Sequence, residues 1–363
     1  MNNYVFQDIV CGKEGLLKGP FGSDLKRSLY VEKTNSAYKV YLQENILDET
    51  LDAGDHYISK EYYESKMSRY AVKENDFIVT CDGTLGEIYQ LKGIKEKGII
   101  SSSLLRITLN PQIVDYDYFY YLFKFLIKKE LIIQANNSVL KHLPGIEIIR
   151  KHPISLPDMN VQKKIGAILA SIDAQIKRNN EMVQKLQVLG KTIYSKKITN
   201  CLFDKMSLNA VITTGKEDAN HAKINGKYKF FTCGDNSLMC DDFKFEGKSV
   251  LVAGNGNFNV KYYDGKFNAY QRTYIVKNDK IIGNLYYTLL FNTELFRKKS
   301  NGSIIKFITI DMLNKIDVPI FSNEINNALN KILSKINEIQ SNIFKLNNFK
   351  EILIPILING QLQ

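Results

Sequence analysis

The stretch that determines the fold is residues 160–197, NVQKKIGAILASIDAQIKRNNEMVQKLQVLGKTIYSKK. Every third or fourth position belongs to one seam, which consists of Ile165, Ile168, Ile172, Ile176, Asn179, Val183, Leu186, Gly190 and Ile193. A period near 3.5 over so many turns is typical of one strand of a coiled coil. Pro157 precedes the stretch, and Asp158 or Asn160 can serve as its N-cap. We therefore predict a helix roughly 55 Å long, which needs a partner helix to cover its seam.

A second seam near the end of the chain supplies that partner. It steps by four and three residues through Ile325, Leu329, Ile332, Ile336, Ile339, Ile343 and Leu346, and ends near Pro355. Because both seams are apolar and similar in length, each can bury the other. We expect the two helices to pair within the chain as an antiparallel coiled coil with pseudo-twofold symmetry.

The segments before the two helices read as mixed α/β globules, so the predicted fold class is α+β. In the first globule, short β-like runs at 38–42, 76–80, 86–91 and 104–109 alternate with Gly- and Asp-containing turns, and an aromatic-rich helix follows at 116–131. The expected boundaries are 1–155 for the first globule, 156–200 for the central helix, 201–321 for the second globule and 322–363 for the C-terminal helix.

The two globules are copies of one module. The run beginning SVLKHLPGI at Ser138 aligns about 165 positions later with SIIKFITI at Ser303. Further upstream, DFIVTCDGTLG at 76–86 matches KSVLVAGNGN at 248–257 in type, because each is a strand that runs into a Gly-bracketed turn. A doubled module favours recognition of a partner that is itself repetitive or in two parts.

Composition narrows the partner classes. The 363 residues carry 49 Lys and Arg against 38 Asp and Glu, a formal charge of +11, with 44% hydrophobic residues. These values are typical of a globular protein and favour a polyanionic partner. No window is apolar enough to span a membrane and the N-terminal residues do not resemble a signal peptide, so we expect a cytoplasmic location.

Metal and catalytic motifs are not recognisable. The five cysteines form no C-x-x-C pair, and the four histidines lie far apart in sequence, so we expect neither a disulfide framework nor a bound metal. The Gly254–Gly256 pair lacks the third glycine of a dinucleotide fingerprint, and Thr214-Gly-Lys-Glu is not a P-loop. We expect no catalytic residue in this chain. Two alternatives remain open: a stand-alone enzyme that modifies or cleaves DNA, and a coiled-coil scaffold that does not bind DNA.

Candidate DNA contacts are basic, amide and hydroxyl side chains on loops that follow strands, where ordinary turn chemistry is the competing explanation. The two modules place such groups at corresponding positions: Thr80, Asp82, Thr84 and residues 101–103 in the first module hold the places of residues 255–259 and 268–273 in the second. The candidates are Ser23, Lys26, Arg27, Thr80, Asp82, Thr84, Ser101, Ser102, Ser103, Asn255, Asn257, Asn259, Tyr270, Gln271 and Arg272.

Several stretches match motifs of one known family: GPFGSDLK at 19–26, DFIVTCDGTLG at 76–86, ISLP at 154–157 with the QKKIGAILASIDAQI run from Gln162, Asn179-Asn180, and YQRTY at 270–274. On these residues the chain resembles the specificity subunits of type I restriction-modification enzymes. It implies a non-catalytic DNA-binding subunit with two target recognition domains, each of which reads one half of a split sequence, held apart by the two helices.

The resemblance also implies partners. Two methyltransferase subunits, which carry S-adenosylmethionine, would dock on the helices, and restriction subunits using ATP and Mg²⁺ would complete a complex for phage defence. No cofactor is expected in this chain itself. The residues assigned to docking by the resemblance are Gln162, Ile165, Ile168, Ile172, Asp173, Ile176, Asn180, Ile332, Ile336 and Ile339. The second helix departs from the family pattern, because Asn337 stands where an Asp is expected.

Overall fold

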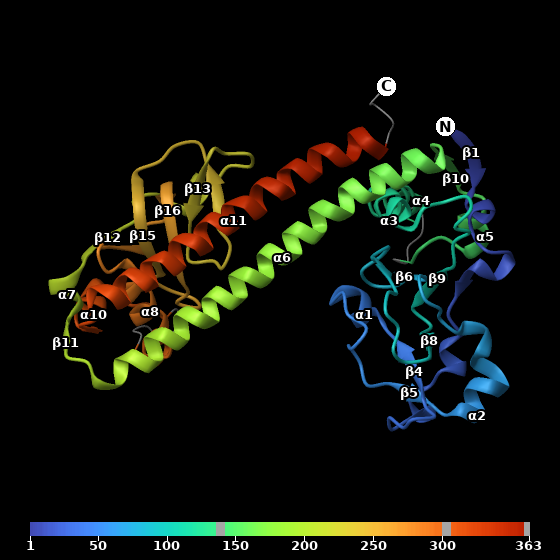
Figure 1. Ribbon diagram of the computed structural model, residues 1–363, viewed down its shortest axis with the longest axis horizontal. Coiled ribbons are helices and arrows are strands. Elements are labelled where there is room, and N and C mark those ends of the chain that lie inside the picture. The colour runs from blue at the N-terminus through green and yellow to red at the C-terminus, as the bar shows by residue number, and fades with distance from the viewer. Residues whose placement is uncertain (136–141, 300–305, 359–363) are drawn as a thin grey trace. The chain divides into compact units, whose positions relative to one another are not determined.

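The computed structural model describes residues 1–135, 142–299 and 306–358 (Figure 1). It divides into two compact units, one made of Met1–Ala174 with Asn348–Gln363 and the other of Gln175–Asn347. Each unit therefore contains one globule and a part of both long helices. None of the helices among the described residues is long and apolar enough to cross a membrane.

The two long helices are α6, Met159–Lys197, and α11, Asn323–Ile358, green and red in Figure 1. In the first unit, Ile165 and Leu169 near the start of α6 share a core with Ile358 at the end of α11. In the second unit, Val183 of α6 shares a core with Ile336 of α11, and the end of α6 packs beside the beginning of α11. The pairing is antiparallel, as predicted, and Pro355 lies inside α11 rather than at its end.

The buried stripe of α6 departs from the predicted seam near Ile193, where the neighbouring Tyr194 is buried and Ile193 is half-buried, and near Ile168. Ile168 is exposed, whereas its neighbour Leu169 is completely buried. Ile165 and Ile172 are buried as predicted. A straight helix advances 3.6 residues per turn, so a strict 3.5-residue seam drifts around its surface, and here the residue that faces the core is Leu169.

The first unit contains two four-stranded sheets and one strand pair, with strand orders β2-β9-β6-β7, β3-β5-β4-β8 and β1-β10. Its strands are β1 Asn2–Val5, β2 Leu16–Lys18, β3 Tyr30–Val31, β4 Tyr38–Tyr41, β5 Tyr57–Ile58, β6 Phe77–Thr80, β7 Ile88–Gln90, β8 Gly98–Ile100, β9 Leu104–Ile107 and β10 Pro153–Leu156. Its short α-helices are α1 Gln43–Leu47, α2 Lys60–Tyr62, α3 Tyr116–Leu122, α4 Lys128–Ala135 and α5 Ile146–Arg150. The predicted helix at 116–131 is α3 and α4, joined by a π-helical turn at Phe123–Ile127.

The second unit contains a six-stranded sheet of order β12-β17-β15-β16-β13-β14 and the strand pair β11-β18. Its strands are β11 Phe203–Lys205, β12 Val211–Thr214, β13 Tyr228–Phe231, β14 Leu238–Cys240, β15 Phe245–Ala253, β16 Val260–Ala269, β17 Thr273–Lys277 and β18 Asp317–Pro319. Its short α-helices are α7 Met206–Asn209, α8 Ile282–Phe291, α9 Thr293–Lys299 and α10 Ile310–Asn314.

The predicted repeat is visible in the way that each long helix begins. An antiparallel strand pair, β1-β10 or β11-β18, precedes each helix. A buried amide in the first turns then donates to a carbonyl five residues earlier: Gln162 to Pro157 at 2.9 Å and Asn326 to Phe321 at 3.1 Å. Part of the sequence repeat, residues 138–141 and 303–305, lies outside the described residues.

Gly190 lets α6 approach the second globule closely. A Cβ atom at this position would overlap the Tyr287 hydroxyl on α8, and Tyr287 is itself almost completely buried. One turn further along α6, the hydroxyl groups of Tyr194 and Thr288 form a hydrogen bond of 2.9 Å. Gly190 therefore permits the close packing between α6 and α8.

We predict that Gly190→Ala lowers the free energy of unfolding by about 1–3 kcal/mol, because the added methyl group must displace Tyr287 from a filled core. Thermal unfolding monitored by circular dichroism measures the effect. Gln184→Ala, at an exposed α6 position, is the matched control and should leave the midpoint nearly unchanged. A Gly190→Ala midpoint equal to that of the wild type would contradict the close packing.

Candidate nucleic-acid interface

In the first unit, main-chain hydrogen bonds gather three loops into one cluster, which we call loop cluster 1: residues 19–27, 80–84 and 101–103. Gly19 donates its N–H to the Leu104 carbonyl at 2.8 Å, and Cys81 donates to the Ser103 carbonyl at 2.8 Å. A Cβ on Gly19 would overlap the Ser101 carbonyl oxygen. Strands β6 and β9, which are paired and buried, hold these loops at one end of their sheet.

Loop cluster 1 exposes aromatic, polar and basic side chains. Phe21 is 80% exposed, and Ser23, Lys26 and Arg27 beside it are exposed as well. Asp82 accepts a hydrogen bond on its main-chain carbonyl from Gln43 at 2.7 Å, and its carboxylate contacts His142 Nδ1 at 2.5 Å. A mixed surface of cations, hydroxyls and a free aromatic ring suits contact with a nucleic-acid backbone and bases.

Two predicted contact residues of this cluster are engaged in internal structure. Thr80 is completely buried; its hydroxyl donates to the Thr84 carbonyl and accepts the Glu87 N–H at 3.0 Å. Ser101 is also buried, and its hydroxyl lies 3.2 Å from that of Ser103. Asp82 and Ser102 are half-buried, and Thr84 is exposed. Thr80 and Ser101 therefore shape the turns, while the other residues supply the accessible groups.

In the second unit, the corresponding loops form loop cluster 2: residues 215–217, 254–259 and 270–272. Gly254 donates its N–H to the Arg272 carbonyl at 2.8 Å, and Gly215 donates to the Thr273 carbonyl at 2.9 Å. Asn257, Gln271 and Arg272 are exposed, whereas Asn255, Asn259 and Tyr270 are half-buried. Arg272 and Gln271 also line a cavity of about 340 Å³ with Phe307 and Thr309.

The two loop clusters have the same main-chain connections. The hydrogen bond from the Cys81 N–H to the Ser103 carbonyl corresponds to the one from the Gly254 N–H to the Arg272 carbonyl. The isolated β-bridge between Asp82 and His142 likewise corresponds to the bridge between Asn255 and Phe307. Gly83 and Gly256, at equivalent turn positions, both have positive φ, 70° and 71°. The predicted correspondence of residues 101–103 with 270–272 is therefore confirmed in the backbone, while the side chains differ completely.

Asn259 acts differently from the other members of loop cluster 2. Its amide donates to the Cys233 carbonyl and to the Asp235 carboxylate, both at 3.0 Å. Phe258 beside it is buried and has φ of 51°. Asn259 thus joins the β15–β16 turn to the loop after β13, and its amide is already committed to that contact.

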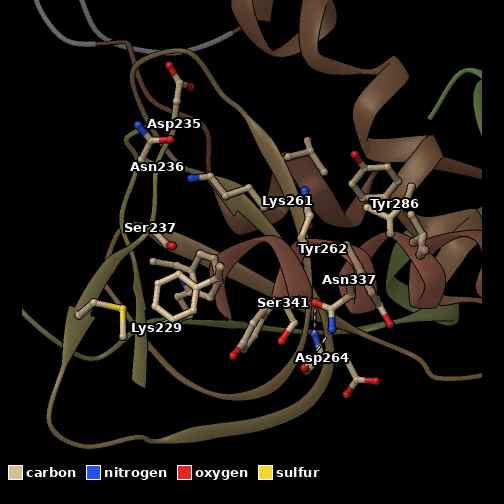
Figure 2. Close-up of a pocket in the computed structure, with 18 of the residues that line it drawn as sticks. Lys229, Asp235, Asn236, Ser237, Lys261, Tyr262, Asp264, Tyr286, Asn337 and Ser341 are labelled. Carbon is tan, nitrogen blue, oxygen red and sulfur yellow. Dashed lines mark hydrogen bonds between the residues drawn. The ribbon is translucent and has the colours of Figure 1, made fainter. Parts of the chain in front are cut away.

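A larger pocket, of about 680 Å³, lies in the second unit between the sheet and α11 (Figure 2). Burial lowers the pKa of two lysines that line it, Lys229 and Lys261. Asn337 closes part of its wall, because its amide accepts the Asp264 N–H at 3.3 Å and donates to the Asp264 carbonyl at 3.4 Å. A neutral amide can make both bonds and a carboxylate cannot, which is the physical reason for Asn rather than Asp here.

The helix residues assigned to partner docking are mostly engaged within this chain. Gln162 is buried; it accepts the Asp115 N–H at 3.0 Å and donates to the Ile113 carbonyl at 3.1 Å. Asp173 accepts from Tyr121 at 2.7 Å and from Lys350 at 2.6 Å, both in the first unit. Ile165, Ile172, Ile332, Ile336 and Ile339 are buried, Ile176 is half-buried, and Ile168 and Asn180 are exposed. Only the exposed members are directly accessible to a partner, so docking on this set stays a prediction.

Comparison with known proteins identifies the family. The sequence model of one protein family, the type I restriction modification DNA specificity domain, matches this chain twice, at residues 24–188 and 207–352. The chain belongs to this family. The first match contains two complete loops of loop cluster 1, 80–84 and 101–103, and the second contains all of loop cluster 2. Each match also contains a long-helix segment, so the repeat found in the sequence is a repeat of the family domain.

Specificity-subunit relatives share moderate identity with parts of the chain. The EcoDI specificity subunit of Escherichia coli is 33% identical over 160 residues, 42% of this chain and 36% of the relative. The MjaVIII specificity subunit of Methanocaldococcus jannaschii is 28% identical over 214 residues, 54% and 49% of the two chains. These alignments span half or less of the relatives' lengths. The crystal structure of the type I S subunit from M. genitalium has the same fold, with a TM-score of 0.68 at 14% identity over 98% of this chain and 95% of that one.

Substitution can separate the structural role of the buried Thr80 from the exposed position of Thr84. We predict that Thr80→Val lowers the free energy of unfolding by about 1–3 kcal/mol, because it leaves the Glu87 N–H without its hydroxyl acceptor. Thr84→Val, which removes an exposed hydroxyl on the same turn, should leave stability unchanged. Urea unfolding of both variants measures the difference, and equal stabilities would refute the structural role of Thr80.

Proposed function

We propose that this chain is the DNA-recognition subunit of a type I restriction-modification complex and reads a bipartite DNA target, one half with each loop cluster. The observation that carries the proposal is the equivalence of the two clusters: identical main-chain connections present different exposed side chains at matching positions. Such an arrangement suits two readers of similar geometry and different sequence preference.

Each loop cluster would divide its contacts between phosphates and bases. Lys26 and Arg27 of loop cluster 1 are exposed cations, which suit phosphate contacts that orient the unit without reading sequence. Arg272, Gln271 and Asn257 of loop cluster 2 carry forked or amide donors, which suit the edges of guanine and adenine in the major groove. Thr84 and Ser102 would be the corresponding reading groups of loop cluster 1.

The long helices would set the distance between the half-sites and dock two methyltransferase subunits. Helix α6 is continuous over 39 residues, about 58 Å at about 1.5 Å per residue. In this proposal the partner subunits supply methylation with S-adenosylmethionine, and restriction subunits supply the steps that need ATP and Mg²⁺. This chain contributes recognition and performs no catalytic step.

We predict that Arg272→Ala, measured in the complex with its partner subunits, relaxes one position of one half-site and weakens DNA binding by about 1–3 kcal/mol. Lys280→Ala removes the same charge from an exposed position outside both loop clusters and is the matched control. Methylome sequencing reads the half-sites, and binding titrations at several salt concentrations read the phosphate contacts.

The same measurements separate the alternatives. A change in both half-sites would overturn the two-reader proposal. Complete absence of salt-dependent DNA binding by the complex would favour a coiled-coil scaffold. Methylation or cleavage by the purified chain alone, with S-adenosylmethionine or Mg²⁺, would favour a stand-alone enzyme.

The distance role of the helices gives a further prediction. Because α6 and α11 pair with each other, seven residues must be inserted into both, after Gln175 and after Asn347, to keep the apolar stripes in phase. This adds about 10 Å and should lengthen the unread spacer by about three base pairs. Methylome sequencing of the variant gives the spacer length. An unchanged spacer in an active complex would disprove the distance role.

A further inference from the structure

Three side chains of different chemistry meet in the second unit near the edge of the six-stranded sheet. His221 ends the 3₁₀ turn Ala219–His221, Cys240 is the last residue of β14, and Asp242 follows two residues later. An imidazole nitrogen, the Cys240 Sγ and a carboxylate oxygen all lie within 4.8 Å of one another. His221 Nε2 is 2.6 Å from Asp242 Oδ1. Among the described residues, this is the one group of three or more His, Cys, Asp and Glu side chains with such spacing.

The surroundings of the group orient its members. Glu217 Oε2 lies 3.4 Å from His221 Nδ1, so the imidazole has a carboxylate on one nitrogen and Asp242 on the other. Lys244 pairs with the other oxygen of Glu217. The completely buried Asn268 donates to Asp242 Oδ1 at 3.5 Å. A histidine that binds metal through one nitrogen usually has its second nitrogen held in this way by a carboxylate.

We propose that His221, Cys240 and Asp242 bind one zinc ion, in contrast to the expectation from sequence motifs. Nitrogen, sulfur and oxygen ligands together favour zinc among the common divalent ions. When the ion binds, the Cys240 thiol gives up its proton to solvent, and one thiolate and one carboxylate then balance the charge of Zn²⁺. Zinc would replace the direct His221–Asp242 contact.

The fourth coordination position would face solvent. Cys240 is fully buried, whereas the side chain of Asp242 is about half exposed and that of His221 less so. Three protein ligands plus water is a common zinc arrangement. Glu217 would remain the orienting residue on His221 Nδ1 and would not coordinate the ion.

Bound zinc would restrict the motion of loop cluster 2 through hydrogen bonds between the zinc-binding segment and the 270–272 turn. Gln271 donates its N–H to the Glu217 carbonyl at 2.9 Å, and Glu217 donates to the Ala269 carbonyl at 3.2 Å. The segment that carries Glu217 and His221 is therefore hydrogen-bonded to the 270–272 turn. Zinc would connect this segment to β14 and restrict the turn that bears Arg272.

The test is metal content and cobalt spectroscopy of the full-length chain. The chain is equilibrated with zinc, freed of loosely bound metal by a chelating resin, and analysed by elemental mass spectrometry. Equimolar zinc is expected in the wild type, with at least a tenfold loss in Cys240→Ser and in His221→Ala. Replacement of zinc by Co²⁺ should give tetrahedral d–d bands and a thiolate-to-cobalt charge-transfer band, and Cys240→Ser should lose the latter.

Cys233→Ser is the matched control, because Cys233 lies in the same unit but its Sγ contacts the Arg272 carbonyl, 3.4 Å away, and it is not part of the group. It should retain zinc and both cobalt bands. Circular dichroism confirms folding of each variant. A wild-type chain with no retained zinc and no cobalt spectrum would overturn the proposal, as would a folded Cys240→Ser that binds as much metal as the wild type.

Discussion

The antiparallel pairing of α6 with α11 is the interaction on which the rest of the structure depends. The first unit is complete only with residues from the end of the chain, because Ile358 is buried in its core and Lys350 binds Asp173. The second unit in turn contains the last part of α6, where Tyr194 packs among Phe321, Tyr287 and Phe291. Each globule thus uses both helices, which removes most of the two apolar seams from water.

Polar contacts made by the two long helices explain one difference between the two copies. In the first unit, Asp173 accepts hydrogen bonds from Tyr121 and Lys350, so a carboxylate is appropriate. In the second unit, Asn337 bonds to the N–H and the carbonyl of Asp264, which only an amide can do. At this position each copy of the domain therefore carries the polar group that its own neighbours can satisfy.

The loop clusters show how a common backbone supports different surfaces. Hydrogen bonds between main-chain atoms, together with Gly83 and Gly256 at positive φ, hold the turns without using the exposed side chains. Exposed positions such as Thr84 and Asn257 can therefore change with little effect on folding. This separation is the physical basis for assigning recognition to the clusters and stability to the strands behind them.

The sequence by itself determined the helical seams, the doubled module and the correspondence of residues 101–103 with 270–272, because periodicity and turn chemistry are local properties. Only the tertiary structure decided which of the same residues are accessible. Thr80 and Ser101 have the composition of contact residues yet are buried in turns, and Leu169 rather than Ile168 faces the core. The group formed by His221, Cys240 and Asp242 escaped motif analysis because the fold brings the turn at His221 beside the end of β14, where Lys223 donates its N–H to the Met239 carbonyl. Burial and proximity arise from packing between segments distant in the chain, and no local pattern encodes them.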